Sequence, residues 1–285
     1  MGGKIKNLSN RSIKKTNHLP IRITDYFKEQ TLMRKILFFI LLIITVSVSC
    51  TNNKPIKGWK IDSSKNTDIG YADKYDKLPK LTFETITENE FLSLAPKTYI
   101  QTIKPDQNKD FFYIQTDLNK HKFKKYKDYG GKESWSGNEF VGYYPDLKLF
   151  AITDNSTAEN LGFGQLFLLD SVTDYQYNII SFGDGNVALP IPSLNNKYFV
   201  YYYNSVYEHK NCDIGVLKIN GKSNPQNYLS EYASYRSNDF AIEQIIWKSD
   251  NCFYVKGYEE IYENDNWIKK YKYYKTDLNK NTSVQ

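Results

Sequence analysis

Short runs of aromatic and branched apolar residues, separated by turn-forming pairs, constrain the fold more than any other feature of this chain. The runs are rich in Tyr, Phe, Ile and Val, and Asp-Gly, Asn-Gly, Asn-Asn and Asp-Asn pairs punctuate them. The chain holds 25 Tyr and 16 Phe, which favour strands over helices. One short helix is expected over 88–94, after the N-cap candidate Thr87, and a weaker one near 228–235. The sequence therefore predicts an all-β fold of antiparallel hairpins.

Three segments repeat one pattern, in which a turn-forming stretch introduces a hydrophobic strand. The aligned positions Lys148, Lys197 and Cys252 are 49 and 55 residues apart, a spacing within the range of four-stranded propeller blades. A second strand follows each first strand after 17 or 18 residues. The first strands lie in 145–152, 193–201 and 248–255, and the second strands in 165–169, 214–219 and 270–274. Residues 111–114 with 123–126 could supply one more strand pair.

The repeated unit resembles the blade of WD-like and Tol-system β-propellers, where a turn with Pro, Asp and Gly or Asn introduces a strand and its hairpin partner. The resemblance covers about residues 140–277. It implies antiparallel hairpin repeats in a propeller-like arrangement. Three units do not close a ring, because a closed propeller takes at least four blades. The alternative is an open sheet or an ordinary antiparallel sandwich.

Residues 33–50 form the most distinctive segment outside the strands. Met33, Arg34 and Lys35 precede about a dozen apolar residues, then small residues, then Cys50. The apolar run is shorter than the roughly 20 residues of a membrane-spanning helix and has the length of a signal-peptide hydrophobic region. The segment resembles the signal of bacterial lipoproteins, although Ser47 stands where that family usually has an aliphatic residue. The resemblance implies cleavage before Cys50 and lipid attachment to that cysteine.

This resemblance implies a division of the chain into four segments. We interpret residues 1–32 as an over-called upstream extension, 33–49 as the signal peptide, 50–80 as a lipid-anchored polar tether and 81–280 as the all-β domain. The family's acyl chains would hold the protein in the outer membrane of a bacterial envelope. No acidic tag follows Cys50, where the sequence is Thr51-Asn52-Asn53-Lys54, and this favours the periplasmic face.

The basic charge of the chain is concentrated before Cys50. The whole chain has 38 Lys and Arg against 32 Asp and Glu, a net charge of +6. Residues 1–49 hold nine bases and two acids, so the remainder has 38 − 9 = 29 bases and 32 − 2 = 30 acids, net −1. Arg236 is the only arginine after Cys50. Because arginine forks dominate specific base and phosphate recognition, no nucleic-acid partner is expected, and the basic stretch 120–132 is interpreted as a solvated sheet edge.

Few residues suit acid–base, nucleophilic or metal chemistry. Only His121 and His209 follow Cys50, no Gly-x-Ser-x-Gly motif occurs, and no cysteine pair has zinc-ligand spacing. No metal or cofactor is therefore expected. Cys212 and Cys252 each precede an apolar strand pattern, so in an oxidising compartment they could form a disulfide. The alternative, left open, is two buried thiols.

Glu259, Glu260 and Glu263 cluster beside Tyr258 and Tyr262. Paired carboxylates support glycoside hydrolysis, but such a run also makes a charged, soluble strand edge. Tyrosines at alternate positions in 143–144, 199–203 and 271–274 place some rings outward from strands, where they can form a binding surface. The sequence thus predicts a non-catalytic binding or scaffolding domain for an envelope protein or glycan. The alternative is a glycan-active hydrolase using the three glutamates.

Overall fold

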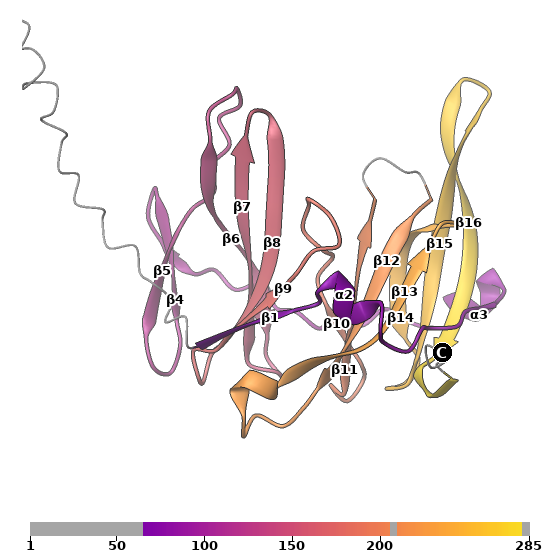
Figure 1. Cartoon of the computed structure of the whole chain (residues 1–285), viewed down its shortest axis with the longest axis horizontal. Coiled ribbons are helices and arrows are strands. Elements are labelled where there is room, and N and C mark those ends of the chain that lie inside the picture. Colours follow the sequence, from indigo (N-terminus) through magenta and orange to yellow (C-terminus); the bar gives the residue numbers. More distant parts are fainter. Residues whose placement is uncertain (1–64, 206–209, 281–285) are drawn as a thin grey trace, which may run out of the picture. The chain divides into compact units, whose positions relative to one another are not determined.

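Strands dominate the part of the chain that can be described and form four sheets within it (Figure 1). The structure is a computed structural model that describes residues 65–205 and 210–280. All of these residues belong to one compact unit, Trp59–Gln285. Strand neighbours in these ranges are antiparallel, apart from the parallel pair β1 and β9. The predicted all-β class with antiparallel hairpins is confirmed.

The sheets are numbered here from first to fourth along the chain. The first sheet holds β3 (Asp106–Gln107), β4 (Phe111–Gln115) and β5 (Lys120–Lys124). The second, in the order β1-β9-β8-β7-β6, holds β1 (Asn66–Ile69), β6 (Trp135–Tyr144), β7 (Leu149–Ala158), β8 (Leu161–Asp170) and β9 (Gln176–Ile179). The third holds β10 (Ile191–Pro192), β11 (Tyr198–Asn204), β12 (Cys212–Ile219) and β13 (Leu229–Ser237). The fourth, in the order β14-β15-β16-β2, holds β14 (Ala241–Trp247), β15 (Cys252–Glu263), β16 (Asn266–Asp277) and β2 (Glu84–Thr85).

The predicted repeats correspond to the central hairpins of three sheets. Their strand pairs are β7–β8, β11–β12 and β15–β16, each paired in antiparallel register. The additional predicted pair is β4–β5 of the first sheet. The recurring unit is therefore one sheet, because the chain forms the consecutive strands of one sheet before starting the next. Only β1 and β2, which join the second and fourth sheets, come from earlier in the chain.

Helices are short, and one helix prediction is wrong. The helix α3 (Glu88–Leu92) begins where predicted, and the Thr87 hydroxyl caps it by accepting a hydrogen bond from the Glu90 backbone N–H at 3.2 Å. The weaker helix expected near 228–235 is instead strand β13, because its backbone pairs with β12. The other helical turns are α2 (Ala72–Tyr75), η2 (Pro225–Asn227) and η3 (Leu278–Lys280). No helix among the described residues is both long and apolar enough to cross a bilayer.

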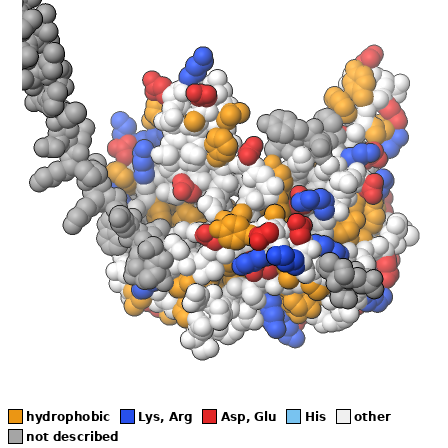
Figure 2. All heavy atoms as spheres, in the orientation of Figure 1, with side chains coloured by type: hydrophobic (Ala, Val, Ile, Leu, Met, Phe, Trp, Pro, Cys, Tyr) orange, Lys and Arg blue, Asp and Glu red, His pale blue; other side chains and the backbone are white. Residues whose placement is uncertain are grey.

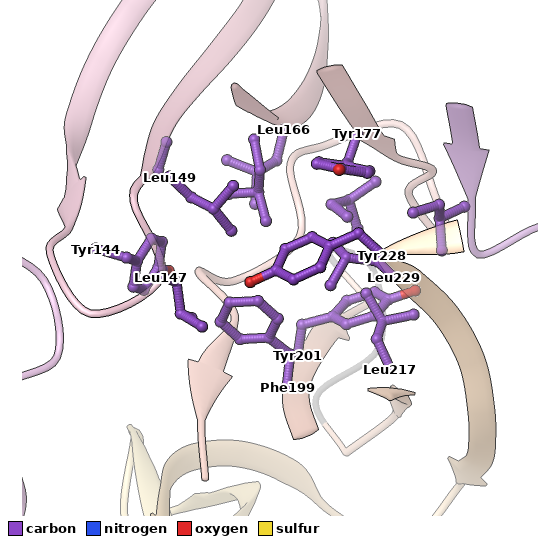
Figure 3. Close-up of a cluster of buried hydrophobic side chains, with 14 of the residues drawn as sticks. Tyr144, Leu147, Leu149, Leu166, Tyr177, Phe199, Tyr201, Leu217, Tyr228 and Leu229 are labelled. Atoms are coloured by element: carbon purple, nitrogen blue, oxygen red, sulfur yellow. The ribbon is translucent and has the colours of Figure 1, made fainter. Parts of the chain in front are cut away.

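Successive sheets pack face to face, because side chains along a strand alternate between its two faces. In β7, Leu149 and Ala151 join a cluster shared with the third sheet (Figure 3), whereas Phe150 and Ile152 pack with the first sheet. Burial of each such side chain stabilises the fold by about 1.5–3 kcal/mol. The third and fourth sheets meet through a further cluster that includes Val200, Ile214, Val216, Phe253 and Val255.

The stack is open at the fourth sheet. Tyr254, on the far side of that sheet, packs against Ile86 and Phe91, so α3 covers the face to which another sheet would otherwise pack. No cluster of buried side chains in the described ranges joins the fourth sheet to the first. The four sheets therefore follow one another in a row, with the first sheet and α3 at its ends.

Residues 66–92 form a strap along the edges of three sheets. Strand β1 pairs with β9 of the second sheet, Lys80 bridges to Ser234 in β13 of the third, and β2 pairs with β16 of the fourth. Four strap side chains are almost completely buried: Ile69 at 1% exposed, Leu81 and Phe91 at 2%, and Tyr75 at 3%. The strap thereby connects three sheets that are otherwise joined only through their faces and short connections.

The predicted boundary at residue 81 is therefore wrong, and the folded domain includes residues 66–80 of the predicted tether. These residues are held by backbone hydrogen bonds to sheet edges and by a few buried side chains, so their polar composition does not exclude order. The strap turns at Gly70, where φ is +97° and an added Cβ would lie 2.5 Å from the Tyr201 hydroxyl, so a side chain cannot be accommodated there. Residues 1–64, with the signal peptide and Cys50, lie outside the described residues.

Candidate functional site

The end of the β15–β16 hairpin projects beyond the fourth sheet (Figure 1). Pairing with β14 ends at Tyr258, and β2 pairs only with Tyr274 and Lys275. Residues 258–272 are here called the ribbon. Beyond the pair Tyr258 and Tyr271, its two strands have no neighbouring strand among residues 65–205 and 210–280. The turn at Asn264 and Asp265 has φ values of 52° and 62°, as in the two-residue turns that match the right-handed strand twist.

One side of the ribbon, here called the ring face, carries two pairs of aromatic side chains. Tyr262 lies directly opposite Trp267, and Tyr258 lies opposite Tyr271, which places all four on one face. Tyr262 is 59% exposed and Trp267 is 58% exposed, and their ring centroids lie 5.4 Å apart. Figure 2 shows hydrophobic side chains gathered on this projecting part. The ring face continues the face that α3 covers lower down, and its two outer rings are more than half exposed.

Lysines cover the inner ring pair of this face. The Lys256 ammonium lies 4.0 Å from the Tyr271 ring centroid, and the Lys269 ammonium lies 3.9 Å from that of Tyr258. Glu243 of β14 holds both lysines, with its carboxylate oxygens 3.8 Å from the Lys256 Nζ and 3.2 Å from the Lys269 Nζ. Burial raises the pKa of Tyr258, the ring nearest the sheet. The outer pair, Tyr262 and Trp267, is left as the accessible aromatic surface.

The three predicted glutamates do not converge on one point. Glu259 and Glu263 share the side of the ribbon opposite the ring face, whereas Glu260 lies on the ring face across from Lys269. Glu263 pairs with Lys270 at 2.7 Å, and Glu259 pairs with both Lys210 and Lys272 at 3.5 Å.

The electrostatics of Glu259 differ from those of a general acid. Partial desolvation alone would raise the pKa of Glu259, but Lys272 and Lys210 outweigh it and lower the pKa. A glycosidase acid needs the opposite shift. The arrangement is that of a lysine-paired strand surface, and we base no catalytic proposal on it.

The two cysteines that follow Cys50 are free thiols in different sheets. Cys212 opens β12 and is buried in the cluster between the third and fourth sheets. Cys252 opens β15, is half-buried, and packs on the other side of the fourth sheet. The disulfide alternative is therefore not realised in this structure, and the alternative of two thiols describes it. Burial raises the pKa of Cys212, which keeps it a protonated thiol at neutral pH.

His121 is largely buried, which contradicts its predicted place on a solvated edge. Its Nε2 lies 3.0 Å from the Oδ1 of Asp174, and its side chain is 13% exposed. Asp174 also accepts hydrogen bonds from the Thr116 hydroxyl and the Asn119 amide. This cluster joins the β4–β5 turn to the β8–β9 turn, so the contacts shown dock the first sheet onto the second. His209 lies outside the described residues.

No set of three or more His, Cys, Asp or Glu side chains in residues 65–205 and 210–280 is arranged to hold a metal ion. The ring face is the candidate site, because two of its large rings are more than half exposed. Tyr271, which is 42% exposed, is among the tyrosines predicted to form a binding surface, whereas the more exposed Tyr262 and Trp267 are not predicted as a pair. Tyr262 lies two residues before Asn264, and Trp267 lies two residues after Asp265. A two-residue turn at Asn264-Asp265 would therefore have predicted that these two rings lie opposite each other.

Comparisons with known proteins are negative. No protein-family model, no curated protein sequence and no solved structure matches this chain.

Proposed function

We propose that this protein is a lipid-anchored, non-catalytic binding protein of the bacterial envelope, and that its ring face docks on a partner protein. The observation that carries the proposal is the pair Tyr262 and Trp267, which are opposed across the ribbon and both more than half exposed. Large rings of this kind supply much of the binding energy of protein interfaces. The lipid anchor is inferred from the lipoprotein-like segment that ends at Cys50.

A protein partner fits the ring face better than a glycan does. A sugar ring packs flat against an aromatic face, but lysine ammonium groups already lie over Tyr258 and Tyr271. The two remaining rings are tilted by 58° to each other, and the charged pair Glu260 and Lys269 lies beside them on the same face. Tilted rings with an adjacent charged border instead suit an apolar pocket with a polar rim, as in protein–protein contacts.

The face, rather than the edge, is the contact that we propose. In the part of the chain that the structure describes, the outer edge of β16 has no strand partner before Tyr273, so its backbone groups could pair with another strand. However, Lys269, Lys270 and Lys272 line this edge. Lysines on an edge strand oppose the addition of a further strand. The partner therefore contacts the ring face of the ribbon and not the edge of β16.

Site-specific crosslinking tests this contact. A photo-crosslinking amino acid placed at Trp267 should capture one partner protein in cells, whereas the same group at Ile268, on the opposite face, should not. With that partner purified, the double variant Tyr262→Ala/Trp267→Ala should weaken binding by about 100-fold, because two central aromatic residues are removed. The matched control Glu263→Gln/Ile268→Ala, on the opposite face, should change affinity less than about twofold.

Three results would contradict the proposed contact. Equal crosslinking from both faces would mean that the rings do not select the partner. Unchanged affinity in the double variant would remove the ring face from the contact. Crosslinking only to a second copy of the chain, with self-association lost in the double variant, would replace the partner protein by a homo-oligomer.

The anchor has a separate test. Cys50→Ala should abolish incorporation of a labelled fatty acid and release the protein from the membrane fraction, because no other cysteine lies near the signal segment. Cys212→Ala should leave both labelling and membrane attachment unchanged, since Cys212 is buried. Labelling that persists in Cys50→Ala would exclude lipidation at this residue.

A further inference from the structure

A second surface with binding capacity lies at the other end of the row of sheets, where the chain passes from the first sheet to the second. A pocket of about 370 Å³ opens there, within the size range of small-molecule sites. Residues of β4, the end of β5, the following loop and the start of β6 enclose it. They are Asp110, Phe111, Lys124, Lys125, Lys127, Tyr129, Trp135 and Ser136.

The backbone holds this pocket in place. The Lys125 N–H donates to the Asp110 carbonyl at 2.8 Å, and the Tyr126 N–H donates to the Asn138 carbonyl at 3.0 Å. The crossing is so close that a Cβ on Gly137 would lie 2.5 Å from the Tyr126 nitrogen. A glycine at this position lets the two segments touch. The pocket wall is therefore fixed by main-chain contacts rather than by side chains alone.

The charge of the pocket is only partly neutralised. Residues 104–132 contain eight lysines and four aspartates, a local net charge of 8 − 4 = +4 in a chain that is near neutral after Cys50. Lys127 pairs with Asp110 at 2.8 Å. Lys124 and Lys125 form no ion pair with any residue in the described part of the chain. Lys124 and Lys125 thus line the pocket without a close ion pair, although Lys125 is near enough to Asp110 to help lower the pKa of that carboxylate.

Aromatic rings stand beside these lysines. Tyr129 is 66% exposed, and its ring centroid lies 4.6 Å from that of Trp135, with the rings tilted by 57°. The Trp135 indole N–H donates to the Gly130 carbonyl at 3.4 Å, which positions the indole against the loop. Unlike the inner rings of the ribbon, neither Tyr129 nor Trp135 has a lysine ammonium over its face.

We infer that this pocket binds an acidic saccharide, with its carboxylate or phosphate at Lys124 and Lys125 and the C–H face of a sugar ring against Tyr129 or Trp135. Lysine ammonium groups act as point charges that accept either anion without a fixed bidentate geometry. The tilt between the rings leaves no parallel slot for a planar base, which disfavours a nucleotide. The site is separate from the ring face, so either proposal can fail without the other.

Calorimetric titration of the purified protein tests the pocket with defined sugars. N-acetylmuramic acid and glucosamine 6-phosphate serve as the carboxylate and phosphate probes, and N-acetylglucosamine is the neutral control. At least one acidic sugar should bind about tenfold more tightly than the neutral sugar, and binding should weaken as salt is added. The two acidic probes show which anion is preferred.

Variants separate the pocket from general surface charge. Lys124→Gln/Lys125→Gln should weaken binding of the acidic sugar by about 30-fold, and Tyr129→Ala by about fivefold. The matched control is Lys120→Gln in the same strand β5, because Lys120 pairs with Asp106 at 3.2 Å and neither residue lines the pocket. It should leave affinity unchanged.

Four results would overturn the inference. Inorganic phosphate or acetate binding as tightly as the acidic sugars would remove the rings from the site. Equal loss in Lys120→Gln would indicate nonspecific charge. Binding only to single-stranded RNA, or no binding of any acidic sugar, would assign the pocket to another ligand or to none.

Discussion

Tyr75→Ala should lower the free energy of unfolding by about 3–5 kcal/mol, as for other large buried aromatic side chains. Tyr75 is 3% exposed, its hydroxyl lies 2.7 Å from that of Tyr201, and its ring lies 5.5 Å from the Phe182 ring centroid. It anchors the strap in the hydrophobic cluster that the second and third sheets share. Since domains are stable by only about 5–15 kcal/mol, this loss should be plain in urea unfolding followed by circular dichroism.

Two variants show which interaction is responsible. Tyr75→Phe keeps the ring but leaves the hydroxyl of Tyr201, which is fully buried, without this partner, so we expect a loss of about 1–3 kcal/mol. Tyr71→Ala removes a tyrosine that is 42% exposed in the same strap and should cost about 0.5 kcal/mol or less. If Tyr75→Ala were no worse than Tyr71→Ala, the strap would not belong to the cooperative domain.

The contrast between the hairpins and the strap shows what a sequence can reveal about this fold. The strands of β7–β8 and β15–β16 were predictable, because alternation of side chains and the residue types of tight turns are local properties. The strap was not, because β1 and β2 are bound to sheet edges mainly through backbone groups. Only Ile69 and Tyr75 mark β1 and α2 as ordered, and two apolar residues in a polar stretch form no pattern.

The candidate sites also differ in whether the sequence could predict them. The exposure of Tyr271 followed from its place in an alternating strand, and the pairing of Tyr262 with Trp267 follows from the turn between them. The pocket beside Trp135 could not be predicted, since it depends on the backbone of residues 125–126 crossing at Gly137, a contact between two sheets. His121 was misplaced for a related reason, because its partner Asp174 is 53 residues away.

The open row of sheets explains why both candidate surfaces lie at its ends. An inner sheet has both faces buried against its neighbours, as the alternation of Leu149 and Phe150 shows in the second sheet. The first and fourth sheets each have one neighbouring sheet only. Aromatic and charged side chains on their outward sides are consequently free to meet a ligand or partner, whereas the tyrosines of β11 are largely used in packing.

Asp174→Ala should destabilise the docking of the first sheet by about 2–4 kcal/mol, because it removes the shared acceptor of three donors. Asp174 is 5% exposed and accepts from Thr116, Asn119 and His121. The effect should be local, since the first sheet lies at the end of the row and can open separately. Hydrogen exchange should accelerate in β4 and β5 far more than in β11 and β12.

The charge of Asp174 makes the same contact sensitive to acid. Burial opposes ionisation, but hydrogen bonds from Thr116, His121 and Asn119 outweigh it and lower the pKa of Asp174. Because folding lowers this pKa below its unfolded value of about 3.9, the stabilisation is fully present above about pH 5 and is lost as the pH falls through the folded pKa. Stability of the wild-type protein should therefore decline more steeply below about pH 4 than that of Asp174→Asn.

Asp174→Asn is the suitable comparison, because asparagine has nearly the same shape and tolerates the left-handed conformation found here, with φ at 60°. It removes the charge while keeping one acceptor oxygen, so it should retain more of the docking than Asp174→Ala. Asp184→Asn, an exposed aspartate in the β9–β10 loop, controls for the loss of one negative charge. Identical acid sensitivity in wild-type protein and Asp174→Asn would show that another carboxylate governs the acid response, and unchanged exchange in Asp174→Ala would show that hydrophobic packing alone docks the first sheet.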